Sequence, residues 1–172
     1  MAACPHDHMI TGSVLDILIY VFDRYMLTEV AEVPERAHLV RDLERAGFAQ
    51  VNVERALDWL ADLACDRDRP PLPVSVSDAG KGPAVRVFSD CELARLSTEC
   101  RGFLVTLERL GILSPQQREI VIERMLALDA DELDTEQLKW VVLMVLSSQP
   151  GQEVAFEMLE DLVSGGHSNT PH

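Results

Sequence analysis

The fold is decided by one stretch, Ser114–Leu146, which reads SPQQREIVIERMLALDADELDTEQLKWVVLMVL. It predicts two helices joined by an acidic link. Asp134 and Gln137 have the spacing of an N-cap and its capping-box partner at the start of the second helix. Every residue of Trp140–Leu146 is apolar, which leaves that helix without a polar face. We therefore predict that the second helix is central and is surrounded by other helices.

Helical periodicity continues on both sides of this stretch and predicts an all-α fold of about seven helices, built as helical-hairpin or three-helix modules. Along the chain we expect a disordered extension (1–12), a helical half (13–65), a proline- and glycine-rich excursion (66–88), a second helical half (89–163) and a frayed tail (164–172). The two halves are expected to form a single domain, 13–163. Alternating apolar residues at about 74–88 fit either one small β-ribbon or an extended loop.

The apolar runs do not fit a membrane span or a secretion signal. Trp140–Leu146 is far shorter than the roughly 20 residues that cross a bilayer. The first apolar stretch, Val14–Phe22, is interrupted by Asp16. The four cysteines form no C-x-x-C pair and no zinc-like spacing with the histidines, so we expect reduced thiols. The sequence therefore predicts a cytoplasmic protein.

The chain is strongly acidic, with 15 basic and 29 acidic residues and a formal net charge of -14. Such a charge favours solubility and repels the phosphate backbone of DNA and RNA. We therefore expect a partner to be another protein, with no direct binding to nucleic acid or to a membrane.

Residues 35–64 predict a tight helical hairpin whose pattern, A-G-F followed by A-L-x-W-L, looks like a helix-turn-helix or a ubiquitin-associated-type module. A DNA-reading helix exposes arginine, lysine, asparagine or glutamine. The polar positions of the second helix here include Glu54, Asp58 and Asp62, which favours a protein-facing or structural role. The DNA-binding alternative requires a contiguous positive face formed by Arg36, Arg41, Arg45 and Arg55.

The acidic link is the main candidate binding site. An EF-hand loop starting at Asp129 requires an oxygen ligand, glycine and glutamate at its fifth, sixth and twelfth positions. This chain has Leu133, Asp134 and Trp140 there, which excludes calcium binding of that kind. Either the carboxylates cap the helix and are otherwise solvated, or they dock a basic partner. The residues predicted for docking are Asp131, Glu132, Asp134 and Glu136.

Recognised catalytic motifs are absent from the sequence: it has no G-x-S-x-G, P-loop, dinucleotide-binding fingerprint or H-E-x-x-H. Cys100 lies on an apolar helical stripe, which favours a core position over a reactive thiol. The metal-binding residue types of the extension are not pre-organised: Cys4, His6 and His8. We therefore predict no catalytic residue, cofactor or metal. An enzymatic alternative requires a deep pocket that collects Arg101, Lys139 and acidic residues.

Four further segments carry a resemblance: VLDILIYVFDRY (Val14–Tyr25), CRGFL (Cys100–Leu104), VIERMLALD (Val121–Asp129) and LKWVVLMVL (Leu138–Leu146). Together with the hairpin pattern, they resemble the bacterial Smg protein family over roughly residues 13 to 163. The resemblance implies a cytosolic bacterial protein from a family of unknown function, with no accepted catalytic residues to carry over. It also implies relatives often encoded near a DNA-processing protein involved in DNA uptake and near a topoisomerase-like zinc-ribbon protein.

These observations predict a non-catalytic protein-interaction or regulatory module. The alternative is a nucleic-acid-associated protein in a DNA-processing or topology pathway that uses the hairpin at 35–64. The distribution of charge on that hairpin discriminates between the two.

Overall fold

The structure, a computed structural model, describes residues 12–26, 34–68, 70, 86–128, 133–149 and 151–165. The predicted all-α fold is confirmed, because these residues contain eight α-helices and one π-helical turn. The chain forms two compact units, Met1–Ala61 and Asp62–His172, and the boundary between them falls inside one helix. A single domain over 13–163 stays a prediction. Most of the expected extension, excursion and tail lies outside the described residues.

In the first unit, α1 (Val14–Val21) continues into a π-helical turn, η1 (Phe22–Met26). Ser13 begins α1 as its N-cap: its hydroxyl accepts from the backbone N–H of Asp16 at 3.2 Å, and the Asp16 carboxylate accepts from the Ser13 N–H at 3.1 Å. The apolar face of this segment is buried at Val14, Ile17, Leu18, Val21 and Phe22.

The predicted hairpin is formed by α2 (Arg36–Arg45) and the helix α3 (Gln50–Arg67). Gly47 lies between them with φ +98°, a left-handed conformation that favours glycine after a helix. The following Phe48 is buried and meets the ring of Tyr20 edge-on, with the ring centroids 5.6 Å apart. This aromatic contact fixes the corner of the hairpin against α1.

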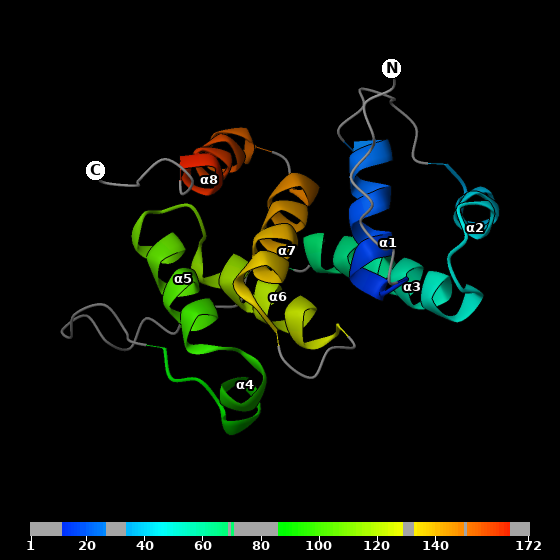
Figure 1. Cartoon of the computed structure of the whole chain (residues 1–172). Coiled ribbons are helices and arrows are strands. Elements are labelled where there is room, and N and C mark those ends of the chain that lie inside the picture. The colour runs from blue at the N-terminus through cyan, green and yellow to red at the C-terminus, as the bar shows by residue number, and fades with distance from the viewer. Residues whose placement is uncertain are drawn as a thin grey trace, which may run out of the picture. The chain divides into compact units, whose positions relative to one another are not determined.

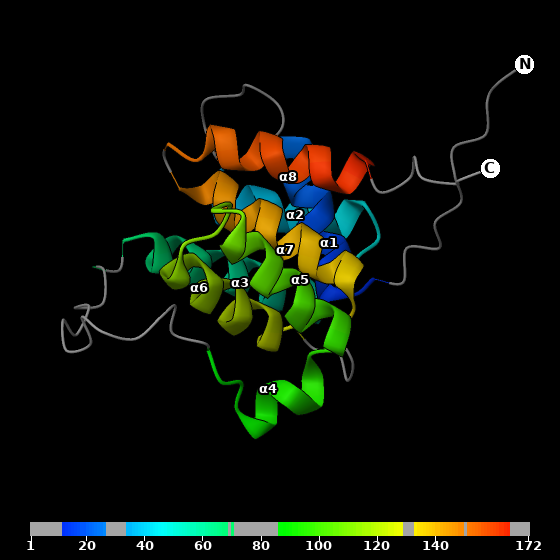
Figure 2. The same ribbon diagram turned by 90° about the vertical axis from the view of Figure 1, so that its left-hand side faces the viewer.

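The second unit is built around α7 (Thr135–Ser148). The other helices wholly within this unit are α4 (Asp90–Arg95), α5 (Thr98–Arg109), α6 (Pro115–Leu126) and α8 (Glu153–Gly165). Figures 1 and 2 show α7 beside α5, α6 and α8, as the contacts between these helices also require. The buried residues of α7 are Leu138, Val141, Val142, Met144, Val145 and Leu146. The predicted central position is confirmed, although Trp140 and Leu143 are only half-buried.

Capping boxes begin the two helices of the stretch that decides the fold. At α6, Ser114 Oγ accepts from the backbone N–H of Gln117 at 3.2 Å. At α7, Asp134 Oδ1 accepts from the backbone N–H of Gln137 at 2.8 Å. Each cap stabilises its helix by about 1 kcal/mol, so the sequence signal has a direct energetic basis.

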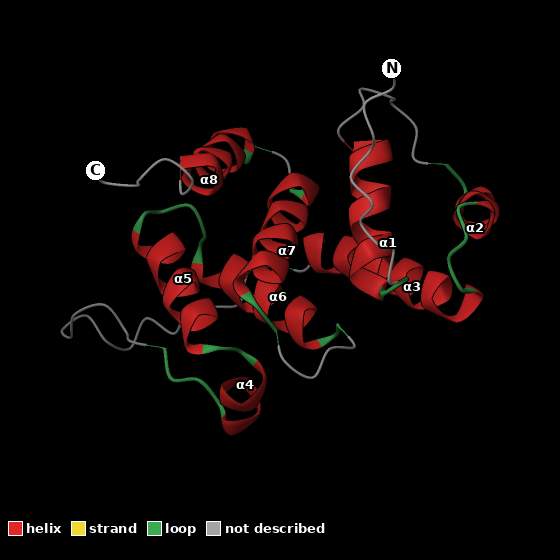
Figure 3. Ribbon diagram, in the orientation of Figure 1, coloured by secondary structure: helices red, strands yellow, loops and turns green. Residues whose placement is uncertain are grey.

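The described residues contain helices and loops and no strand (Figure 3). Their only β-type pairing is an isolated parallel bridge between Leu96 and Leu133. Of the β-ribbon considered at 74–88, residues 86–88 form a loop and the rest lies outside the described residues. No described helix has the length and apolar character needed to cross a membrane.

Candidate functional site

The acidic link is described only in part, because Asp131 and Glu132 lie outside the described residues. Asp134 is exposed and its carboxylate caps α7. Glu136 is exposed in the first turn of α7, where its Oε1 lies 2.6 Å from Nζ of Lys139. Both described carboxylates therefore have a local structural role, and docking of a partner at the link stays a prediction.

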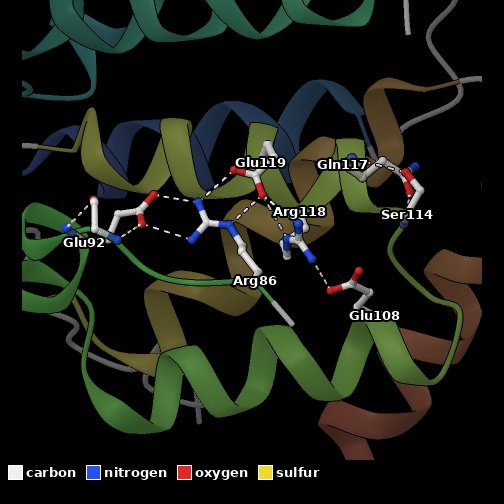
Figure 4. A network of polar contacts seen from close by, with 8 residues as sticks. Arg86, Glu92, Glu108, Ser114, Gln117, Arg118 and Glu119 are labelled. Carbon is white, nitrogen blue, oxygen red and sulfur yellow. Dashed lines mark hydrogen bonds and ion pairs between the residues drawn. The ribbon is translucent and has the colours of Figure 1, made fainter. Parts of the chain in front are cut away.

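A connected set of ion pairs surrounds Arg86, in the loop before α4 (Figure 4). Its guanidinium lies between Glu92 of α4 and Glu119 of α6 and donates to both oxygens of each carboxylate, at 2.6 to 3.0 Å. Two such bidentate contacts fix the position and the orientation of a planar guanidinium. The same group lies over the ring of Phe88, 4.7 Å from its centroid, in a cation–π contact.

Glu119 extends the set of ion pairs to α5. Its Oε1 accepts from Nη2 and Nε of the neighbouring Arg118, at 2.8 and 3.0 Å. Arg118 also pairs with Glu108 of α5, and the Arg118 side chain is only 11% exposed. These five residues, the Arg86 network, are Arg86, Glu92, Glu108, Arg118 and Glu119. The network joins α4, α5 and α6 through charge.

The Arg86 guanidinium favours the ionised form of two carboxylates, Glu92 and Glu119. Hydrogen bonds from Arg86 lower the pKa of Glu92 to about 2, and they also lower the pKa of Glu119. The two carboxylates in turn raise the pKa of Arg86. A carboxyl group that acts as a general acid near neutral pH needs a raised pKa. The shifts at Glu92 and Glu119 have the opposite direction and are those of a structural ion-pair network.

Two further guanidiniums of the second unit bond to oxygen atoms of the chain. Arg95 of α4 donates to the carbonyl oxygen of Leu126, the last residue of α6, at 2.5 Å, and to that of Leu128, just after the helix, at 2.7 Å. Carbonyl groups at the C-terminal end of a helix lack hydrogen-bond donors within the helix. Arg95 therefore supplies a donor that α6 itself does not have. Arg124 of α6 lies 3.3 Å from Oδ2 of Asp62 and 3.2 Å from Oδ2 of Asp66.

The Arg86 network was not predicted from the sequence, because the contact that connects its two parts joins residues far apart along the chain. Arg86 is 33 residues from Glu119, and no local spacing rule connects them. Arg86 also lies in the alternating run A-V-R-V-F that suggested a β-ribbon. The one available signal was an arginine set between apolar residues.

The arginines of the hairpin are interspersed with carboxylates. Arg36 Nη2 lies 2.8 Å from Oδ1 of Asp58, and Arg41 Nε donates to a backbone carbonyl of its own helix at 3.2 Å. Exposed Glu44 and Glu54 lie on the same two helices. Carboxylates in these positions oppose contact with a phosphate backbone, which counts against the DNA-binding alternative.

Cys100 occupies the core position predicted for it: the residue is fully buried and its Sγ donates to the carbonyl oxygen of Leu133 at 3.3 Å. Among the described residues, no group of three His, Cys, Asp or Glu side chains is placed to hold a metal ion. The prediction for Cys4, His6 and His8 concerns residues outside the described part of the chain.

Two depressions in the second unit have polar linings. One of about 520 Å³ lies where α4 meets α5 and is lined in part by Arg95, Glu99 and Arg101. The other, of about 270 Å³, is lined by Asp66, Arg67, Ser114, Gln116, Gln117, Gln149 and Gln152. Neither brings Arg101 and Lys139 together, so neither is the pocket that the enzymatic alternative requires.

The fold and these contacts define an all-α protein in which partly buried charges join the helices of one unit. The family described as "Protein of unknown function (DUF494)" matches residues 14–172. Proteins described as "Protein Smg homolog" are similar over most of the chain. The one from Nitrosococcus oceani is 43% identical over 93% of this chain and 98% of its own length. The one from Methylococcus capsulatus is 45% identical over 88% of this chain and 92% of its own length.

The chain therefore belongs to the Smg family, a family of unknown function. This confirms the resemblance found in the sequence. No solved structure matches the chain.

Proposed function

We propose that this protein is a non-catalytic, cytoplasmic protein-interaction or regulatory module that binds a basic surface of another protein. The proposal is supported by one asymmetry in the second unit. Several of its arginines, Arg86, Arg118 and Arg124 among them, are turned inward onto the chain's own carboxylates, while many of its carboxylates face solvent. The partner is a protein, without direct binding to nucleic acid or to a membrane.

The exposed fractions of the charged side chains carry this argument. The side chains of Arg86, Arg118 and Arg124 are 16%, 11% and 12% exposed, and all three are ion-paired. Exposed carboxylates of the same unit are found at Asp90, Glu99, Asp134, Glu136, Glu153, Glu157, Glu160 and Asp161. A surface that presents mainly negative charge attracts a positive surface and repels nucleic acid.

The test is recovery of a partner on the affinity-tagged full chain from native extract in about 0.1 M salt. We expect a stoichiometric protein partner that is released at about 1 M salt, because the Debye length falls from about 10 Å to about 3 Å over that range. Nuclease treatment should leave the recovery unchanged. Repeated failure in gentle salt contradicts the proposal, and recovery that depends on nucleic acid favours the alternative.

The acidic link is tested separately with a variant that removes its charge. The four changes are Asp131→Asn, Glu132→Gln, Asp134→Ser and Glu136→Gln, and serine preserves the N-cap of α7. We expect slower association with the recovered partner, because exposed charges mainly steer encounter. The matched control is Asp90→Asn with Glu99→Gln. An association rate equal to that of the unaltered chain contradicts a docking role for the link.

A further inference from the structure

The outer face of α8 carries two parallel rows of side chains of different chemistry. Glu153, Glu157 and Asp161 are exposed at intervals of four residues. Val154 and Met158 have the same interval and are 68% and 48% exposed. Side chains four residues apart on a helix lie one above the other. A row of carboxylates therefore runs beside a row of apolar side chains.

The opposite face of α8 packs on α7. Leu159 is fully buried there, and Ala155 and Phe156 are half-buried. Figures 1 and 2 both place α8 at the edge of its unit, beside α7. The two outer rows are thus not needed to attach α8 to its own unit.

The carboxylates of α8 are not compensated within the helix. Glu153, Glu157, Glu160 and Asp161 are its charged residues, and it contains no lysine or arginine. Like charges four residues apart repel each other, and carboxylates near the C-terminal end oppose the helix dipole. Within the described part of the chain, none of these carboxylates forms an ion pair. A positively charged ligand would relieve this repulsion.

We infer that the outer face of α8 docks a basic amphipathic helix of a partner protein, an inference that rests on the proposed function. Four residues advance about 6 Å along any α-helix. A partner helix with apolar residues at that interval, beside lysine or arginine at the same interval, therefore matches both rows. Val154 and Met158 provide the apolar anchor, and Glu157 and Asp161 pair with the partner's cations. A second copy of this chain docked through the same face does not fit as the occupant, because α8 has no lysine or arginine to pair with the acidic row.

The probe is a synthetic 18-residue helical peptide with leucine and lysine at these intervals, titrated by fluorescence anisotropy against the full chain in about 0.1 M salt. The control peptide has glutamate in place of every lysine. The apolar row is removed with Val154→Ser and Met158→Ser. Its matched control is Val105→Ser on α5 with Leu110→Ser at the C-cap of α5; these residues are 42% and 51% exposed.

We expect the apolar-row variant to bind the lysine peptide at least roughly tenfold more weakly, and the α5 control to stay within about twofold of the unaltered chain. Charge reversal by Glu157→Lys with Asp161→Lys should weaken binding of the lysine peptide as strongly as loss of the apolar row, and it should reduce the salt dependence of binding. The control Glu99→Lys should have neither effect. The substituted residues are exposed, and unchanged circular dichroism and thermal unfolding verify that the fold is kept.

Absence of binding by the unaltered chain overturns the inference, as does equal weakening by the α5 control or equal binding of the glutamate peptide. A stoichiometric partner that is recovered equally by the unaltered chain and by the α8 variants overturns the α8 surface and leaves the proposed function standing. Failure of the unaltered chain to recover any protein partner contradicts the proposed function itself.

Discussion

The helices α7 and α4 begin with the same kind of capping box and are held in place by different forces. α7 buries six side chains in the core of the second unit. α4 has no buried residue, and its polar ties are the Arg95 side chain at the end of α6, a backbone hydrogen bond from the Leu133 N–H to the Arg95 carbonyl, and the Arg86 network. The apolar anchor nearest to it, Leu96, comes just after its last residue.

This difference separates two kinds of stability within one unit. Each buried aliphatic side chain of α7 contributes about 1.5 to 3 kcal/mol, and that contribution does not depend on ionisation. A helix as short as α4, which has six residues, is not stable by itself in water. Its position therefore depends on contacts with the rest of the unit, the charged groups around it among them. The two helices should respond to different perturbations.

The largest effect is expected from a cavity in α7. Leu138 is fully buried, and Leu138→Ala should lower the free energy of unfolding by about 2 to 5 kcal/mol, measured by urea unfolding followed by circular dichroism. Leu143→Ala, at a half-buried position of the same helix, should cost less. A loss below about 1 kcal/mol at Leu138 would contradict the central position of α7.

The next effect is expected at Arg86. Arg86→Leu leaves Glu92 and Glu119 without their shared cation. Because the three side chains are 16%, 13% and 38% exposed, we expect a cost of about 1 to 3 kcal/mol, below that of a fully buried pair. Hydrogen exchange should accelerate in α4 more than in α7.

The control for Arg86 is an exposed ion pair in the other unit. Arg36 and Asp58 have side chains that are 53% and 69% exposed, so Arg36→Leu should cost less than about 1 kcal/mol. If Arg86→Leu leaves the hydrogen-exchange rates of α4 unchanged, the Arg86 network does not hold this helix in place.

A third prediction follows from the pKa of Glu92, which Arg86 lowers from 4.5 to about 2. Above pH 4.5 the group is ionised in both the folded and unfolded states, and its contribution to stability is fully present. That contribution is lost as the pH falls from about 4.5 through about 2, because the folded state binds its proton less readily. Hydrogen-exchange protection factors of α4 should fall before those of α7 in this window. Glu92→Gln should reduce the difference in pH dependence between the protection factors of α4 and those of α7. A parallel fall of the protection factors in both helices of the unaltered chain would contradict the prediction.

The contrast between α7 and α4 also shows what the sequence makes predictable. Helix starts were predictable where a cap and its partner lie three residues apart, as for Ser114 with Gln117 and Asp134 with Gln137. The central position of α7 followed from its apolar run. Both signals are local, and helical periodicity converts them directly into packing.

Contacts between distant residues were not predictable in this way. One example is the C-terminal end of α3, which lies at Arg67. Asp66 in its last turn is buried beside Arg124, and this contact joins it to a residue much later in the chain. Likewise, the sequence gives the excess of acidic residues but not which charges face inward. The sequence identified Asp134 and Glu136 as candidate docking residues. It did not indicate which cations the Arg86 network removes from the surface.

The smallest expected effect concerns a position that contributes neither burial nor charge. Gly102 lies on the exposed side of α5, and a Cβ added there meets no atom within 4 Å. Gly102→Ala should therefore raise the free energy of unfolding by about 0.5 to 1 kcal/mol, because alanine loses less backbone entropy in a helix. Gly111→Ala is the matched control: a Cβ has equal room there, but φ is +73°, so alanine should be destabilising. Changes of opposite sign in the free energy of unfolding of the two variants, measured by urea unfolding, would isolate the effect of backbone preference from the packing of α7 and from the charges around α4. A loss of stability in Gly102→Ala would contradict the open space seen at that position.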